Sequence, residues 1–383
     1  MTPTLGTVRQ GINAADIKEL AARKGPCVTI FIPDHHPGAQ AGSRPALVRD
    51  MIHGADVLLH HNKALRAQAG DMLAPLEGFA QAEEVESGGP GFAIFAAPHH
   101  IDIFQMPGIG AASAGVASHF ALLPLVERVY TPQEFCILGL STKHLRLLRY
   151  RGGTCEDIPL PPQVPESVEA AGGFKAPDHD LENRSTAGVS TGSMKAVHFG
   201  TLSDREAAGE YQQHFFGIVA HGLKDTLKGA PLLLAGVHEE VAMYRRVSRY
   251  VHILESEIAG NIEFLELEDV ARAAEAAARE HYLRAGKKVL AQFREMPDRA
   301  RTLGGDPHQV LRAAAAGRVH KLCVREMSGV HGHMEHELDT VHLGNEDLLN
   351  AVVVETIRHG GEVYMLPPGE MPASNPLAAI LRF

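Results

Sequence analysis

The sequence predicts an α/β protein of three domains, and three observations lead to this prediction. Short apolar runs suited to buried strands alternate with segments of helical periodicity along the 383 residues. A chain of this length usually holds two or three domains. A stretch of low hydrophobicity, residues 171–195, interrupts the alternation. We expect an N-terminal α/β domain over residues 1–130, a middle domain over 131–297 and a C-terminal α/β domain over 298–383.

The N-terminal domain opens with a predicted helix near Ile17–Ala22 and a buried strand at Cys27–Ile32, which Pro33 ends. A helical region is expected over Ala46–Leu76. The runs GFAIFAAP and HIDIFQMP, on either side of Pro98-His99-His100, predict two paired strands. Alternation of strand and helix over short connections indicates an α/β domain.

The middle domain begins with a predicted meander of three strands, FCILGLSTKHLRLLRYRGGTCEDIPL. Its first strand, Phe135–Leu140, is apolar throughout, as expected of a central strand. Residues 171–195 show no periodicity and are expected to form a mobile loop. Ser203 and Glu206 then form a capping box for a helix. The remaining predicted elements are a buried strand at Pro231–Val237 and helices near Glu239–His252 and Glu268–Phe293.

The C-terminal domain again alternates helices with short strands. Asp306 and Pro307 predict the N-cap and first turn of a helix that Gly317 ends. Asn345 can cap a second helix, which ends at Gly360-Gly361. The predicted strands are Val319–Val324, Val363–Leu366 and Leu377–Phe383.

The order of these elements resembles that of a known group of proteins. GGDPHQVLRAAAAGRVHKLCVRE followed by NEDLLNAVVVETIRHGGEVYMLPPGEMPASNPLAAILRF resembles the C-terminal domain of the archaeal and eukaryotic class-1 peptide release factors and of Pelota. FCILGLSTKHLRLLRYRGG and LLLAGVHEEVAMYRRVSRYVHIL look closest to the bacterial archaeo-eukaryotic release factor families, and to family 3 in particular. The resemblance implies a ribonuclease-H-like middle domain and a C-terminal α/β domain of the release-factor and Pelota type.

The same resemblance implies a translation-associated factor that binds the ribosome or tRNA-like RNA, in rescue of stalled ribosomes or in their protection under stress. A translation GTPase is a further implied partner. The net charge of −10 argues against nonspecific coating of nucleic acid, so RNA contacts must come from local patches, and no DNA partner is expected. No apolar stretch reaches the roughly 18 residues of a membrane span, so we expect a cytoplasmic protein without a membrane partner.

Two cationic groups stand out as candidate RNA contacts. Arginine suits phosphate binding because its guanidinium group donates hydrogen bonds in a fixed fork. The alternative is an ion-paired, solvated surface, in which the second group would pair with Glu239, Glu240 and Glu255. The candidates are Lys143, Arg146 and Arg149 on the second meander strand, and Arg245, Arg246 and Arg249 after LLLAGV.

Release factors hydrolyse peptidyl-tRNA with a Gly-Gly-Gln loop, and this sequence contains no such tripeptide. The corresponding segment reads NRSTAGVSTGSMKAVHFG, so the resemblance to Pelota implies a loop that enters a ribosomal or tRNA site without chemistry. A plain surface loop is the simpler alternative. Another is a peptidyl-tRNA or other ester hydrolase that uses residues 185–200, with His198 as base. The functional-loop candidates are Arg184, Gly192, Ser193, Lys195 and His198.

No catalytic residue, metal site or cofactor is predicted. Phe135–Leu140 contains no acid, and Glu156 and Asp157 should point to opposite faces of their strand, so the ligands of a metal-dependent nuclease are missing. The cluster His331, His333, His336 and His342 favours a solvated loop over a zinc site. The pairs His35-His36, His60-His61 and His99-His100 have no identifiable acid partner in the sequence. A third functional class, a protein-interaction module of a stress response without RNA affinity, agrees with the acidic net charge.

Overall fold

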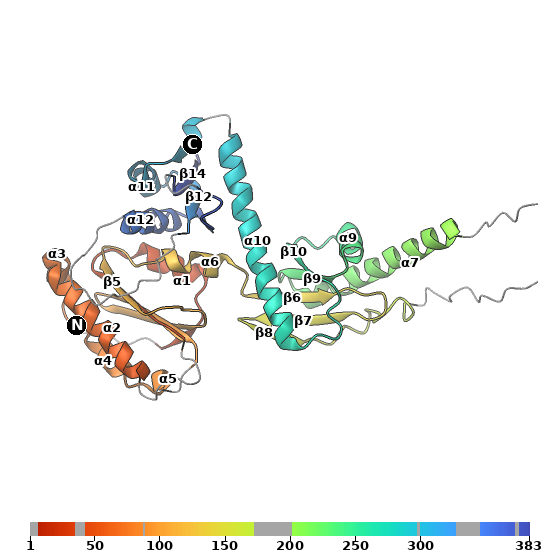
Figure 1. Cartoon of the computed structure of the whole chain (residues 1–383), viewed down its shortest axis with the longest axis horizontal. Coiled ribbons are helices and arrows are strands. Elements are labelled where there is room, and N and C mark those ends of the chain that lie inside the picture. Colours follow the sequence, from red (N-terminus) through yellow and green to blue (C-terminus); the bar gives the residue numbers. More distant parts are fainter. Residues whose placement is uncertain are drawn as a thin grey trace, which may run out of the picture. The chain divides into compact units, whose positions relative to one another are not determined.

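The computed structural model of the chain describes residues 7–34, 43–86, 89–171, 201–296, 299–326, 345–371 and 375–383. The described strands form three sheets, so the protein has the predicted mixed α/β architecture (Figure 1). The chain divides into two compact units, Met1–Thr131 with Tyr282–Phe383, and Pro132–His281. The division into three domains ending at 130, 297 and 383 stays a prediction. No helix in these ranges is long and apolar enough to cross a membrane.

The first unit contains a five-stranded sheet in the order β1-β4-β3-β2-β5. β1 pairs parallel to β4, and the other neighbours are antiparallel. The predicted pairing of GFAIFAAP with HIDIFQMP is confirmed, and His99 between the strands has a φ of 65°. A proline followed by a residue at positive φ is typical of a type II turn. The strands are β1 (Arg9–Gln10), β2 (Cys27–Ile32), β3 (Gly91–Ala97), β4 (His100–Met106) and β5 (Ser113–Ala117).

Both faces of this sheet are buried, because successive side chains of a strand point to opposite faces. Val28, Ile30 and Ile32 of β2 lie in a core with the helices that follow this strand in sequence. Phe31 lies on the other face, where its ring meets that of Phe95 edge to face at a centroid distance of 6.3 Å. The helices of the first face are α2 (Ser43–His61), α3 (Lys63–Ala69), α4 (Ala74–Phe79) and α5 (Glu83–Glu86).

The C-terminal part of the first unit has a four-stranded sheet in the order β11-β14-β12-β13. β12 and β13 are parallel, and β14 is antiparallel to both β11 and β12. Side chains of two helices, α11 (Pro307–Ala315) and α12 (Asn345–Arg358), pack on one face. The strands are β11 (Thr302–Gly304), β12 (Val319–Arg325), β13 (Glu362–Leu366) and β14 (Leu377–Leu381), and η2 (Arg299–Arg301) precedes them.

The other face of this sheet packs against the second half of α10 (Leu267–Glu295). A Cβ atom on Gly286 would lie 2.8 Å from Leu366 Cδ2, so glycine is needed for the helix to approach β13. The Tyr282 hydroxyl accepts a hydrogen bond of 2.6 Å from the Met365 amide. The border between the two units lies inside α10, between His281 and Tyr282.

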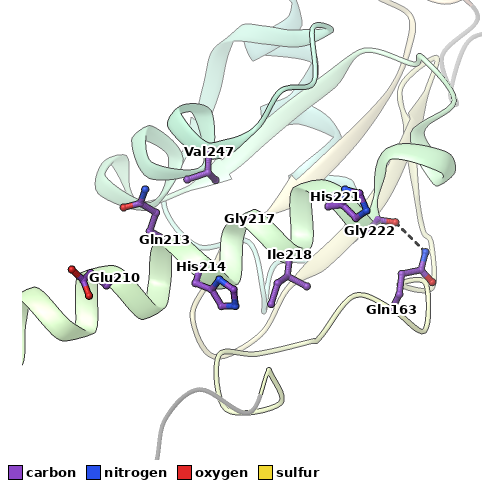
Figure 2. A pocket seen from close by; sticks show the side chains of 9 residues that line it. All are labelled: Gln163, Glu210, Gln213, His214, Gly217, Ile218, His221, Gly222 and Val247. Atoms are coloured by element: carbon purple, nitrogen blue, oxygen red, sulfur yellow. Dashed lines mark hydrogen bonds between the residues drawn. The ribbon is translucent and has the colours of Figure 1, made fainter.

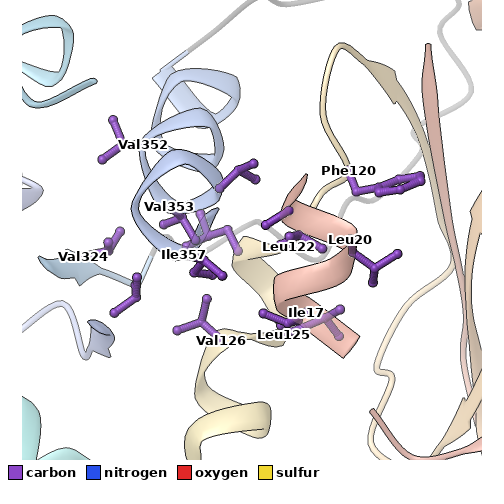
Figure 3. Packing of buried hydrophobic residues seen from close by; sticks show 14 of the residues in the cluster. Ile17, Leu20, Phe120, Leu122, Leu125, Val126, Val324, Val352, Val353 and Ile357 are labelled. Atoms are coloured by element: carbon purple, nitrogen blue, oxygen red, sulfur yellow. The ribbon is translucent and has the colours of Figure 1, made fainter. Parts of the chain in front are cut away.

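One hydrophobic core joins the first sheet to the C-terminal α/β segment (Figure 3). Side chains of α1 (Ala14–Ala22), η1 (Leu123–Leu125) and α6 (Val126–Tyr130) meet those of α12 in this core. Each buried side chain of this kind stabilises the fold by roughly 1.5–3 kcal/mol relative to exposure. The two segments, which lie far apart in sequence, therefore cover each other's apolar faces. The labelled members are Ile17, Leu20, Phe120, Leu122, Leu125, Val126, Val324, Val352, Val353 and Ile357.

Two polar side chains of α12 complete this junction. Asn350 Oδ1 accepts hydrogen bonds from the Leu122 and Leu123 amides at 2.9 and 3.1 Å, and its Nδ2 donates to the Phe120 carbonyl at 2.9 Å. The buried Glu355 carboxylate lies 3.3–3.7 Å from four basic groups, those of Lys24, His119, Arg358 and His359. The geometry of the junction is therefore fixed by directional hydrogen bonds and ion pairs as well as by the burial of apolar side chains.

The second unit contains a five-stranded sheet in the order β10-β9-β6-β7-β8. The predicted meander is confirmed as the antiparallel run β6-β7-β8, whereas β6, β9 and β10 are parallel. Helices α7 (Thr201–Gly222), α8 (Lys224–Leu227) and α9 (His238–Val247) pack on one face, and alanines in the first half of α10 pack on the other. The strands are β6 (Glu134–Gly139), β7 (Arg146–Arg151), β8 (Thr154–Asp157), β9 (Leu232–Gly236) and β10 (Ile253–Ala259). The ribonuclease-H-like assignment of this unit stays a prediction.

Several predicted boundaries move in the structure. The helical region expected over residues 46–76 is divided, because Asn62 caps α3 through the Leu65 amide and Gly70, at a φ of 55°, follows its end. α7 already begins at Thr201, so Ser203 lies inside the helix rather than at its N-cap. α9 ends at Val247 instead of His252. The predicted cap of α11 is confirmed, since the Asp306 side chain accepts from the His308 amide at 2.9 Å.

We expect Asn350→Ala to lower the free energy of unfolding of the first unit by about 2–4 kcal/mol, because three buried main-chain groups lose their partner. Urea unfolding measures this change. Gln10→Ala is the control in the same unit, since its exposed amide bonds to the Gln105 side chain at 2.7 Å, and it should cost under about 1 kcal/mol. Equal effects of the two changes would contradict the role given to Asn350.

We expect His119 to make the protein less stable as the pH is lowered. Burial lowers the pKa of His119 below its ordinary value, with Glu355 opposing this shift. The unfolded chain then binds more protons just below about pH 6.5, so the free energy of unfolding decreases as the pH falls through that window. His119→Gln should show a shallower decline from about pH 7.5 to about pH 5.5 in urea titrations. A steeper decline in the variant would refute this sign.

Candidate nucleic-acid interface

The three arginines of β7 are engaged in ion pairs. Arg146 donates to both carboxylate oxygens of Asp157, at 2.8 and 3.2 Å, and to the carbonyls of Ile262 and Leu265 at 3.0 and 2.8 Å. The hydrogen bond to Asp157 raises the pKa of Arg146. Because the carbonyls lie in the connection between β10 and α10, Arg146 holds that connection against the sheet. The contacts of Arg146 are structural.

Arg149 and Arg151 pair across neighbouring strands, with Glu156 at 3.2 Å and Glu134 at 2.8 Å. Both pairs are largely exposed and contribute little to stability. Asp157 and Glu156 thus bind different arginines, as expected of neighbours on opposite faces of β8. Lys143 is exposed in the turn after β6. The positive charge of β7 is therefore largely compensated.

The second predicted group, around the end of α9, is only partly compensated. Arg245 donates to the carbonyls of Glu255 and Ser256 at 3.3 and 3.1 Å and so connects α9 to β10. Arg246 and Arg249 are exposed, and neither forms an ion pair with a carboxylate in the described part of the chain. Their positions at and beyond the helix C-terminus suit cations. Of the predicted arginines that the structure describes, these two are the ones available to an external phosphate.

A groove of about 690 Å³ runs along the outer face of α7 (Figure 2). Its residues recur at helical spacing, and Val247 of α9 and Gln163 of the preceding loop border it. Gln163 Nε2 donates to the Gly222 carbonyl at 3.2 Å. The helical lining residues are Glu210, Gln213, His214, Gly217, Ile218, His221 and Gly222.

The lining of this groove combines amide and imidazole groups with one carboxylate, that of Glu210. His214 and His221 are seven residues apart, or about 10 Å along the helix axis, so they cannot act on one atom together. Gly217 has open space where a Cβ would be, although glycine inside a helix costs roughly 0.5–1 kcal/mol relative to alanine. Packing within the described chain does not account for this glycine. Amide and imidazole groups on the rim can hydrogen-bond to phosphate or base edges.

The expected mobile loop falls, from residue 172 onward, outside the described residues. The same holds for its predicted functional residues Arg184, Gly192, Ser193, Lys195 and His198, and for the cluster His331, His333, His336 and His342. Among the residues that the structure does describe, no group of three or more histidine, cysteine or acidic side chains could hold a metal ion.

Three of the four cysteines are buried. Cys27, Cys136 and Cys323 are buried, and Cys155 is half-buried. Burial raises the pKa of the Cys27 thiol to about 12, so it stays protonated at neutral pH. A thiol in that state is a poor nucleophile and a poor metal ligand.

The structure reveals acid partners that the sequence analysis missed. His100 Nε2 bonds to Asp102 Oδ2, and the other Asp102 oxygen accepts from Arg9 at 2.7 Å. His60 Nδ1 lies 3.4 Å from Asp56 Oδ2. The signals were present, since residues i and i+2 share a face of a strand and residues i and i+4 share a face of a helix. These pairs belong to the first unit, whereas the α7 groove belongs to the second.

Comparison with known proteins gives one sequence match and several structural ones. Residues 134–318 match the model of the bacterial archaeo-eukaryotic release factor family 3, which confirms the resemblance seen in the sequence. No curated protein matches the chain. The crystal structure of the archaeal translation termination factor aRF1 is 15% identical, with a TM-score of 0.25, over 97% of this chain and 99% of that chain.

Two further structures are similar over long stretches. Archaeoglobus fulgidus Pelota is 13% identical, with a TM-score of 0.33, over 98% of this chain and 93% of that chain. Saccharomyces cerevisiae Dom34, a translation termination-like factor that interacts with Hbs1, is 12% identical, with a TM-score of 0.34, over 72% of this chain and 75% of that chain.

The β7 arginines should differ sharply in their effect on stability. Arg146→Met should lower the free energy of unfolding by about 2–3 kcal/mol, because Asp157 and two carbonyls lose a donor. Arg149→Met, the matched control on the same strand, should change it by less than about 0.5 kcal/mol. Urea unfolding of the two variants measures these effects. If both arginines served only to bind an external ligand, neither substitution would change the free energy of unfolding.

Proposed function

From the match of residues 134–318 to the bacterial archaeo-eukaryotic release factor family 3, we propose that the protein is a translation-associated factor that binds the ribosome or tRNA-like RNA. The family match is the observation that carries this proposal. The chain lacks the Gly-Gly-Gln tripeptide, so the proposed role is binding, in rescue of stalled ribosomes or in their protection, rather than release of the peptide. Its proposed place of action is the cytoplasm.

The exposed arginines at the end of α9 support a local RNA contact in the second unit. A chain with a net charge of −10 is repelled by RNA as a whole, so uncompensated cations must provide the attraction. Arg246 and Arg249 are such cations, and the α7 groove on the same unit offers amide and imidazole groups beside the carboxylate of Glu210. Arg184, Gly192, Ser193, Lys195 and His198 remain the proposed loop contacts, and a translation GTPase remains the proposed protein partner.

Sedimentation with 70S ribosomes across a salt series tests the proposal. Association should weaken as salt rises, because cations that contact phosphates displace counterions. Arg246→Glu/Arg249→Glu should bind more weakly, with a salt dependence shallower by about 1 for each phosphate that the variant no longer binds. Lys18→Glu/Lys63→Glu changes the net charge equally at exposed positions of the first unit and should bind like the unaltered protein.

Absence of association with vacant and with stalled ribosomes would contradict the proposal and favour a protein-interaction role. Peptide release from peptidyl-tRNA that disappears in His198→Ala would instead favour the hydrolase. Failure of both double variants to bind would show that net charge, and not the α9 arginines, determines association.

A further inference from the structure

A continuous set of basic side chains lies on the first unit, whereas the arginines of β7 and α9 lie on the second. The set begins at the junction of α1 and α12, where Glu355 holds Lys24 and His119 at 3.7 Å each. Arg358 and His359, at the end of α12, approach the same carboxylate at 3.3 and 3.5 Å. One carboxylate, itself only 6% exposed, thus faces four basic groups.

Main-chain hydrogen bonds extend this set toward β14. Arg382 Nη2 donates to the His359 carbonyl at 2.8 Å, and the Arg382 carbonyl accepts from Arg301 Nη2 at 3.1 Å. The Arg382 amide donates to the Arg318 carbonyl at 2.9 Å. Four members therefore share the Glu355 carboxylate, and Arg382 links His359 to Arg301 and Arg318. Together they form what we call the basic band: Lys24, His119, Arg301, Arg318, Arg358, His359 and Arg382.

The charge of the basic band is not balanced within the described structure. Among the described residues, the guanidinium groups of Arg301 and Arg382 donate to the main-chain carbonyls of Arg382 and His359, which orient a guanidinium group without neutralising it. Nearby acids are engaged elsewhere, since Glu19 pairs with Arg23 at 3.0 Å and Glu362 lies 3.9 Å from Lys321. Arg301 and Arg382 are exposed. The band is an outward positive patch on a chain of net charge −10.

We infer that the basic band binds the phosphate backbone of RNA. Two of its members, Arg301 and Arg382, are already restrained by carbonyl contacts, so less side-chain entropy is lost when their remaining donors meet a phosphate. The Arg318 guanidinium lies 5.9 Å from the centroid of the Phe383 ring, and Phe383 is 72% exposed. An exposed aromatic ring beside arginines can stack on an unpaired base. This arrangement favours RNA over an acidic peptide, which has no base to stack.

The basic band would be a second RNA-contact surface in the proposed function. The inference rests on that function for the identity of the RNA, which would be that of the ribosome. The arginines of α9 and those of the basic band belong to different units and are tested separately.

Binding of purified full-length protein to a short fluorescent oligouridine and to a fluorescent RNA hairpin, measured by anisotropy across a salt series, tests the inference. Arg301→Glu/Arg318→Glu/Arg382→Glu should lower the affinity at least about tenfold and make the salt dependence shallower by about 1 for each phosphate that is no longer neutralised. The control Lys63→Glu/Lys224→Glu/Arg272→Glu alters the same net charge at exposed positions outside the band and should bind normally.

A milder variant, Arg301→Gln/Arg382→Gln, keeps donors at both exposed positions and should weaken binding less, which guards against misfolding of the triple variant. Unchanged affinity of a folded triple variant, or RNA binding too weak to measure in the unaltered protein, would overturn the inference. So would tighter binding to polyglutamate than to either RNA, since that result assigns the band to an acidic protein.

The same experiments separate the two proposals. RNA binding that depends on the band in a protein that does not sediment with ribosomes would support the inference and refute the proposed function. Ribosome association that is unaffected by the triple variant would support the proposed function and overturn the inference.

Discussion

The packing of α12 against α1 and the segment around η1 is the interaction on which the first unit depends. The first sheet has apolar side chains on both faces, and the helices α2, α3, α4 and α5 cover one of them. Val352, Val353 and Ile357 of α12 pack in the core of the other face. Residues 7–131 and 299–383 are therefore parts of one folded unit, although the whole second unit separates them in sequence.

Asn350 and Glu355 explain why this contact has one geometry. Apolar packing alone tolerates sliding, whereas Asn350 bonds to three main-chain groups between Phe120 and Leu123. Glu355 is buried, and a buried carboxylate is costly without cations close to it. Lys24 and Arg358 carry one positive charge more than this single carboxylate compensates. The burial of Glu355 thus explains both the fixed geometry of this contact and the basic side chains beside it.

The sequence reveals which faces are buried but not what covers them. Phe135–Leu140 is predicted as a buried strand because it is apolar throughout, and Cys27–Ile32 because it is apolar apart from Thr29. The cap at Asp306 follows from local chemistry. The break at Asn62 was missed, since a polar residue at the end of one amphipathic helix gives the same periodic signal whether or not it caps the next. The contact between Asn350 and Leu122 spans 228 residues, and no local pattern encodes it.

Charge shows the same limit, because residue type does not tell whether a charge is compensated. The arginines of β7 form the densest cationic run in the meander, yet acids on β6 and β8 neutralise them across the sheet. Arg301, Arg318 and Arg382 are scattered in sequence and gave no signal, yet β14 and its neighbours bring them together. In an acidic protein, attraction to RNA depends on the few cations that folding leaves without an acid, and these follow from strand pairing rather than from composition.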